Sequence, residues 1–461
     1  MKMFSSKHGE ENISMHRHRV TSGAGRGFAS VVACVLGMAS LTVFSAYAET
    51  WNLEQCVDYA LKHNISIRQT DQRIESGELA LTEAKDGFLP QASAGANQSF
   101  SFGRGLTSEN TYANRNTSST SWNVGLSLPL FQGLREYKRV KVAEMSLQQY
   151  LWESGSARDN VTLNVMSQYL QVLYCKEVVR SSESQAELSA YQVERQKAMI
   201  EAGKVAEATL YDLEALAAQD KLQVVTAGND LQTALVNLAN LLQLPTAEGF
   251  DVIPLENSDP GLSSAEEIYS QASVINNSLL GARQAVKVAE ENISLAKTGY
   301  IPTLNFNAGI GSSFYTVSGF DSESFAKQMK HNFSTSLGFS LNIPIFDAFS
   351  TRNSIRRSRL QKLDAELALE QRETDLQKEI QLAYYQAKGA RERYLTSEET
   401  LEKTRLSFES TRERFDLGRA TQADYEQAKN NLFKTEVSRI QSHYEYLLRA
   451  RVLKFYQTNH L

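Results

Sequence analysis

Residues 124–131 read Val-Gly-Leu-Ser-Leu-Pro-Leu-Phe, and residues 337–346 repeat the pattern as Leu-Gly-Phe-Ser-Leu-Asn-Ile-Pro-Ile-Phe. Both stretches alternate apolar with small polar residues, and their prolines lie 215 positions apart. The segments that follow them, residues 130–244 and 345–461, contain no proline. Alternation with a period of two predicts a strand with one apolar face. A proline-free run predicts long helix, because proline breaks helix interiors.

Other landmarks recur in the same order and predict an internal duplication. Lys-Asp-Gly-Phe-Leu-Pro at 85–90 returns as Lys-Thr-Gly-Tyr-Ile-Pro at 297–302. Ala-Gly-Lys-Val-Ala at 202–206 is matched by Leu-Gly-Arg-Ala-Thr at 417–421, again 215 positions later. Landmarks in one order at one spacing indicate a repeat of about 200 residues.

This spacing sets the expected domain organisation. We expect residues 49–244 and 265–461 to be two structural repeats, each with a helix, two strands and a long helical hairpin. Residues 245–264 hold three of the seven prolines and are predicted to be a linker.

Within each repeat, the helices are expected to pack in pairs. Apolar residues at alternating three- and four-residue spacing predict coiled-coil seams, as in Leu231, Leu235, Leu238 and Leu242. Gly203 and Gly418 stand where a helix end favours a left-handed residue, so they are predicted to mark the tips of two hairpins.

The first 48 residues carry the features of an export signal. Basic residues precede an apolar run at 28–44, and Ala46 and Ala48 form the small-x-small pattern of a cleavage site. A transmembrane anchor is the alternative, although the apolar run is short for one. We expect residues 1–48 to be a signal peptide that directs the chain out of the cytoplasm.

The four predicted strands combine an apolar face with a face of small neutral residues; they cover 92–102, 121–128, 304–310 and 336–343. Such strands suit the wall of an outer-membrane barrel, with an ordinary antiparallel sheet on a core as the alternative. The polar segments 103–119 and 312–332 are predicted to be long loops. Lipid tolerates no open sheet edge, so four strands per chain require several chains, and three would supply about 12 strands around water.

Residues 51–64, Trp-Asn-Leu-Glu-Gln-Cys-Val-Asp-Tyr-Ala-Leu-Lys-His-Asn, resemble the opening of TolC-type outer-membrane efflux proteins. The duplicated Gly-Phe/Tyr-Leu/Ile-Pro turn, the Pro-Leu/Ile-Phe junction and the glycine-centred tips resemble that family as well. The resemblance spans the whole chain after residue 48. It implies a mainly α fold with membrane β structure, in which a homotrimer forms a 12-stranded β-barrel and a 12-helix α-barrel.

The same resemblance implies a function and partners. The protein would be a passive channel in outer-membrane lipid with a long periplasmic extension, the exit duct of a tripartite efflux pump or type I secretion system. Its partners would be a periplasmic adaptor and an inner-membrane transporter of the resistance-nodulation-division or ABC type. The alternative is a periplasmic coiled-coil scaffold or adaptor without a membrane barrel.

By position, the resemblance places adaptor contacts at the two tips: Gly203, Lys204, Val205, Ala206, Thr209 and Asp212 in the first, and Gly418, Arg419, Ala420 and Thr421 in the second. Asp424 matches a family position whose acidic side chains line the closed aperture, and three copies would form a carboxylate ring. Gln427 stands where the family often has a second acid, although Glu426 is adjacent. For Asp424, a solvated carboxylate on a charged helix is the alternative.

The remaining features argue against other classes of protein. A formal net charge of −5 disfavours a nucleic-acid partner, which would require a basic surface. The sequence has no HExxH, clustered Cys and His, Walker A or GxSxG motif. We therefore expect no catalytic residue, metal site or cofactor, and no enzyme.

Overall fold

The computed structural model describes residues 49–106, 110–203, 205, 207–255 and 261–460. The predicted signal peptide at 1–48, with its cleavage residues Ala46 and Ala48, lies outside this part of the chain. None of the described helices combines the length and the apolar character needed to cross a membrane.

The first half of the chain runs from a short strand into two helices, a set of strands and a long helical hairpin. Its elements are β1 (Glu49–Trp51), α1 (Leu53–His63), α2 (Ile65–Asp86), β2 (Gln91–Ser101), β3 (Arg104–Leu106), β4 (Tyr112–Asn114), β5 (Thr117–Phe131), α3 (Arg135–Glu201) and α4 (Ala208–Leu242).

The second half follows the same order of long elements. Its elements are β6 (Phe250–Val252), α5 (Ala265–Ile275), α6 (Asn277–Lys297), the 3₁₀ turn η1 (Thr298–Tyr300), β7 (Thr303–Val317), α7 (Phe325–His331), β8 (Ser334–Asn342), α8 (Ser350–Asp416) and α9 (Gln422–Thr458). The long helices α3 and α8 both have 67 residues.

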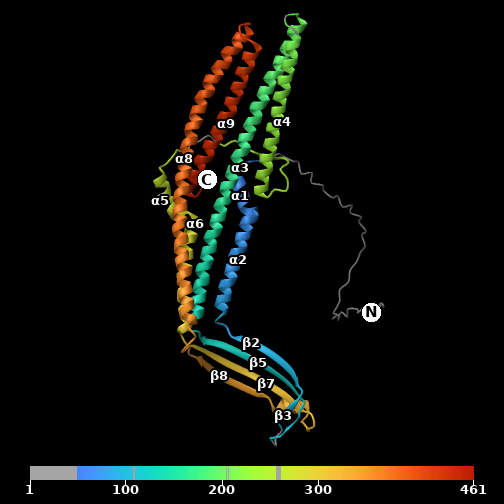
Figure 1. Ribbon diagram of the computed structural model, residues 1–461, viewed down its shortest axis with the longest axis vertical. Helices are drawn as coiled ribbons and strands as arrows, with labels where there is room; N and C mark the ends of the chain where they lie inside the picture. The colour runs from blue at the N-terminus through green and yellow to red at the C-terminus, as the bar shows by residue number, and fades with distance from the viewer. Residues whose placement is uncertain (1–48, 107–109, 204, 206, 256–260, 461) are drawn as a thin grey trace, which may run out of the picture. The chain divides into compact units, whose positions relative to one another are not determined.

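The helices pack lengthwise in hairpins. Helix α3 packs on α4 and α8 on α9, while α3 also contacts α2, α6 and α9 (Figure 1). The main core lies between α1, α3 and α4, where Met166, Leu170, Leu238 and Leu242 are almost completely buried. The predicted seam residues Leu235, Leu238 and Leu242 belong to this core, which confirms the coiled-coil spacing in this helix.

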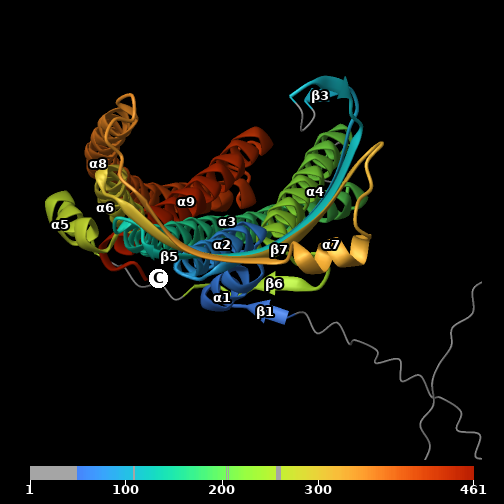
Figure 2. The same cartoon turned by 90° about the horizontal axis from the view of Figure 1, so that it is seen from below.

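Four strands form one antiparallel sheet in the order β2-β5-β7-β8, curved as Figure 2 shows. Its register joins residues of the same kind across all four strands: Ala92, Leu126, Ala308 and Leu337 share one face, and Ser93, Gly125, Gly309 and Ser336 share the other. The predicted alternation is therefore confirmed, since the apolar residues of the four strands gather on one side.

The predicted loops at 103–119 and 312–332 are wrong in part. Strand β5 already begins at Thr117 and β7 continues to Val317, and these extensions, rich in Ser and Thr in β5, pair with each other in register. The remainder holds the β3–β4 hairpin and helix α7. Short Ser and Thr side chains fit a sheet once the neighbouring strand satisfies the backbone, although their composition is typical of loops.

Candidate functional site

Both hairpins turn at the glycines that the sequence singles out. Gly203 has φ +68° and Gly418 has φ +71°, the left-handed conformation expected after a helix end. At the second tip, Arg419 N donates to Arg414 O at 2.7 Å and closes the last turn of α8. A Cβ at either glycine would meet no atom within 4 Å, so the backbone conformation alone favours glycine there.

At the first tip, the predicted contact residues lie at the surface. Thr209 Oγ1 accepts a hydrogen bond of 2.5 Å from Gln196 Nε2, which ties the start of α4 to α3. Asp212 is exposed and Val205 is 38% exposed. Lys204 and Ala206 lie outside the described residues.

At the second tip, Asp424 helps to start helix α9. Thr421 is the N-cap residue: its Oγ1 accepts from Asp424 N at 3.2 Å, while Asp424 Oδ2 accepts from Thr421 N at 3.0 Å and from the Thr421 hydroxyl at 2.7 Å. These hydrogen bonds from Thr421 lower the pKa of the exposed Asp424 carboxyl. The Thr-x-x-Asp pattern at 421–424 is a sequence signal for this reciprocal cap, which we had not predicted. Arg419 is exposed and Ala420 half-buried.

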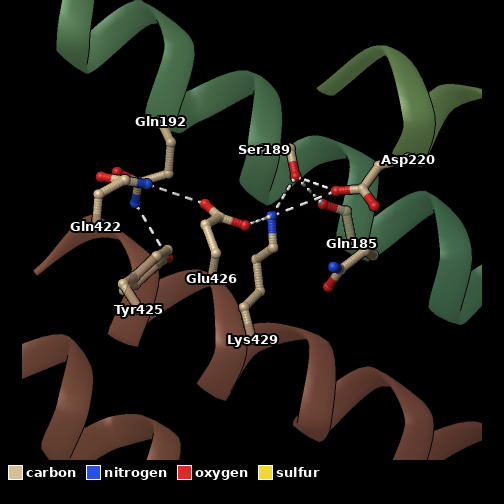
Figure 3. Close-up of polar contacts among 8 residues, drawn as sticks. All are labelled: Gln185, Ser189, Gln192, Asp220, Gln422, Tyr425, Glu426 and Lys429. Carbon is tan, nitrogen blue, oxygen red and sulfur yellow. Dashed lines mark hydrogen bonds and ion pairs between the residues drawn. The ribbon is translucent and has the colours of Figure 1, made fainter. Parts of the chain in front are cut away.

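A buried polar cluster, also not predicted from the sequence, joins the two hairpins within the chain (Figure 3). Lys429 on α9 is only 2% exposed. Its Nζ lies 2.6 Å from Glu426 Oε2 and 3.3 Å from Asp220 Oδ2 on α4, and it donates to Ser189 Oγ on α3 at 2.8 Å. Ser189 in turn donates to Asp220. A buried ammonium is tolerated when carboxylates and hydroxyls surround it in this way.

Aromatic packing continues this contact towards the tips. Tyr425 is fully buried, its ring lies 4.9 Å from that of Phe415, and its hydroxyl accepts from Gln192 Nε2 at 3.1 Å. Arg195 on α3 donates to Asp416 at 2.5 Å. We call Ser189, Asp220, Glu426 and Lys429 the inter-hairpin cluster.

The position of Glu426 bears on the aperture. Because its carboxylate is buried against Lys429, Glu426 does not supply an exposed second acid beside Asp424. The residue at the usual second position, Gln427, is exposed and donates to Asn431 Oδ1 at 2.9 Å. Asp424 is therefore the acid of this turn that solvent reaches.

The described part of the chain contains no group of three or more His, Cys, Asp or Glu side chains placed to hold a metal ion. Cys56 and Cys175 are buried and free, and burial raises the pKa of the Cys56 thiol to about 12. A thiol that stays protonated is a poor nucleophile and a poor metal ligand.

Comparison with known proteins assigns this arrangement to a class. The profile of the outer membrane efflux protein family matches residues 56–243 and again residues 268–456. The chain therefore belongs to the outer membrane efflux protein family, and outer-membrane efflux transport is the activity of its class.

Individual relatives are distant but cover most of the chain. The outer membrane efflux protein BepC of Brucella suis is 21% identical over 91% of this chain and 88% of its own length. The outer membrane protein TolC of Escherichia coli is 21% identical over 90% of this chain and 84% of its own. Among solved structures, the CmeC outer membrane channel of Campylobacter jejuni aligns with a TM-score of 0.70 at 18% identity, covering 88% of this chain and 85% of CmeC. By name, BepC is an outer membrane efflux protein and CmeC an outer membrane channel, and the structural likeness shows the same fold.

Proposed function

We propose that three copies of this chain form a passive channel across the outer membrane. The alignment of the four strands carries this proposal, because apolar residues such as Leu126, Ala308 and Leu337 share one face of the sheet, and small polar residues or glycines share the other face beside them. Within the described residues no strand lies beyond β2 or β8, so both sheet edges are open. Lipid offers no partner for such edges, and three sheets of four strands would close a 12-stranded barrel around water.

The long hairpins would continue this duct into the periplasm. Each chain contributes the four long helices α3, α4, α8 and α9, so that three chains would form a 12-helix α-barrel. In this arrangement the protein is the exit duct of a tripartite efflux pump or a type I secretion system. It carries no catalytic step of its own, so the energy must come from partners.

For this channel we propose the domain organisation that the sequence predicts. Residues 1–48 would be removed on export, residues 49–244 and 265–461 would each supply half of a protomer, and residues 245–264 would link them. The matching order of helix, strands and long hairpin in both halves supports these boundaries.

We propose that the tips of the two hairpins form the regulated end of the channel. Glycine turns and exposed side chains there, among them Asp212 and Arg419, offer a surface to a periplasmic adaptor that connects an inner-membrane transporter of the resistance-nodulation-division or ABC type. Three Asp424 carboxylates would line the closed aperture, where like charges attract cations. The capping bonds of Asp424 occupy one of its oxygens and leave the other available to the lumen.

A direct experiment separates this channel from a periplasmic scaffold. The protein is extracted from outer membranes, its mass in detergent is measured by light scattering, and its conductance is recorded in a planar bilayer. We expect a trimer that conducts ions. A soluble monomer without conductance would establish the scaffold instead, although Leu337 and Phe339 on β8, 72% and 71% exposed, disfavour a water-facing sheet.

A further inference from the structure

Helix α7 closes the part of the β7 edge that β8 leaves open. Strand β8 begins at Ser334, so the last residues of β7 have no strand on that side. Gln328 on α7 takes the place of a strand: its Oε1 accepts from Tyr315 N and its Nε2 donates to Tyr315 O, both at 3.0 Å. Asn332 Nδ2, just after the helix, donates to Ser313 O at 2.7 Å. These bonds fix α7 to the sheet and cover an edge that would otherwise invite pairing.

The same helix rests on the apolar face of the sheet. Ser312 Oγ donates to Met329 O at 2.7 Å, and the rings of Phe314 and Phe325 lie 5.1 Å apart, edge to face. Ser312 and Phe314 are in phase with Phe306, so α7 lies on the face that would meet lipid. Figure 2 shows α7 on the convex side of the curved sheet, away from the proposed lumen.

The distance along β7 places α7 at one boundary of the apolar wall. From Leu304 to Phe314 the strand advances ten residues, about 34 Å at roughly 3.4 Å per residue. A strand tilted by about 40° would rise about 26 Å over this length, close to the apolar band of about 25 Å in outer-membrane barrels. The chain enters the strands from the helices beside Leu304, so α7 lies at the opposite, outer boundary.

The side chains of α7 fit such a boundary. Phe325 and Met329, four residues apart, form its apolar side, whereas Lys327, Lys330 and His331 are exposed. Glu323 pairs with Lys327 at 2.6 Å and with His331 at 3.2 Å. Among the described residues Lys330 forms no salt bridge, which leaves an uncompensated cation.

We propose that α7 is a membrane-surface anchor, whose Phe325 side rests at the outer limit of the acyl chains and whose lysines contact the phosphates of outer-leaflet lipid headgroups. Amphipathic helices with aromatic and basic residues occupy this interface because it is apolar on one side and anionic on the other. This proposal rests on the barrel described under "Proposed function".

Spin labels can measure the depth of α7 in vesicles. Because Cys56 and Cys175 are buried, single cysteines can be labelled at Lys330→Cys, at Phe339→Cys on the apolar face of the wall and at Tyr112→Cys in the exposed β3–β4 hairpin. The protein is reconstituted in phosphatidylcholine vesicles with and without phosphatidylglycerol. Relaxation by dissolved oxygen, compared with relaxation by a water-soluble nickel chelate, then reports the depth of each label.

We expect Phe339→Cys to be deep in lipid, Tyr112→Cys in water and Lys330→Cys at the headgroup level. A label at Phe325→Cys should move towards water when Lys327→Gln and Lys330→Gln are added, and only in phosphatidylglycerol vesicles. The control pair Lys388→Gln and Lys403→Gln on α8 should leave it in place. If Lys330→Cys is as water-exposed as Tyr112→Cys while Phe339→Cys is deep, the anchor is refuted and the barrel stands. If Phe339→Cys is also in water, the barrel itself is refuted.

Discussion

Lys429 Nζ on α9 donates a hydrogen bond of 2.8 Å to Ser189 Oγ on α3, 240 residues earlier in the chain. Asp220 on α4 and Glu426 on α9 complete the charge balance around this ammonium. The two hairpins of one protomer are thus joined near their tips by a buried ionic contact. Such a contact costs much more to leave half-formed than to replace completely.

Removing Lys429 alone should therefore destabilise the protein more than neutralising all three charged residues of the inter-hairpin cluster. Lys429→Met leaves the buried Glu426 and the half-buried Asp220 without their cation, and we expect a loss of stability of about 3–5 kcal/mol. The triple variant Asp220→Asn, Glu426→Gln and Lys429→Met should recover most of that loss. Thermal melting of the detergent-solubilised protein checks this order of stabilities. Lys434→Met, on the same helix but outside the cluster, is the control. A triple variant that melts no higher than Lys429→Met would contradict this interpretation.

The capping interaction at Asp424 predicts a pH dependence at the start of α9. The hydrogen bonds from Thr421 hold the folded pKa of this carboxyl below its ordinary value. Their contribution is therefore present above the ordinary aspartate pKa of about 3.9 and is lost as the pH falls through the lowered folded pKa. Hydrogen exchange of the amides at 422–425, corrected for intrinsic rates, should accelerate over that range.

Thr421→Ala is the matched test of the same cap, because it should weaken the first turn of α9 by about 1 kcal/mol. Exchange in this variant should already be fast at pH 7. Unchanged protection in Thr421→Ala would show that the cap does not hold this turn.

The proposed aperture predicts a change in conductance. Asp424→Asn removes three negative charges from the ring while its amide oxygen can still accept from the backbone, so we expect larger single-channel conductance and weaker block by divalent cations. Asp212→Asn, an exposed acid at the first tip, is the charge-matched comparison. Identical conductance and block in Asp424→Asn and wild type would remove Asp424 from the aperture.

Two Gly→Ala substitutions should change stability in opposite directions, because the two glycines differ in backbone conformation. Gly418→Ala places a Cβ in a left-handed conformation and should destabilise the tip by about 1–2 kcal/mol. Gly228→Ala lies inside α4, where a Cβ meets no atom within 4 Å, and should stabilise that helix by up to about 1 kcal/mol. Proteolysis at the tips and thermal melting distinguish the two. Equal changes in stability in the two variants would mean that backbone conformation does not determine the preference for glycine at these positions.

Much of the fold could be predicted because its signals are local and occur twice. The spacing of Gly203 and Gly418 predicted the turns, and the alternation around Leu126 and Leu337 predicted two strands whose apolar residues share one face. A short-period pattern of this kind directly reflects the geometry of the element that forms it.

The features that could not be predicted depend on contacts between segments distant in the sequence. Lys429 and Glu426 have the composition of a solvated helix face, and only α3 and α4 make them buried. The polar extension that starts at Thr117 is a strand because residues near Val317 pair with it. The family resemblance predicts a pore role for Asp424, whereas the Thr-x-x-Asp cap gives this residue a structural role as well.

The proposed duct predicts opposite outcomes for two neighbouring residues of β7. Phe306 lies on the apolar face and Asn307 on the polar face of the same strand. An arginine on the lipid side costs about 2–4 kcal/mol at the midplane and less towards the interfaces, so Phe306→Arg, between the inner interface and the midplane, should impair membrane assembly by less than the midplane value. Asn307→Arg should assemble normally and place three positive charges in the lumen.

The ion selectivity of reconstituted Asn307→Arg, measured as the reversal potential in a salt gradient, is the decisive measurement. We predict a clear shift towards anions relative to wild type. A reversal potential equal to that of wild type, in a channel that assembles and conducts, would contradict a lumen lined by the polar face of this sheet.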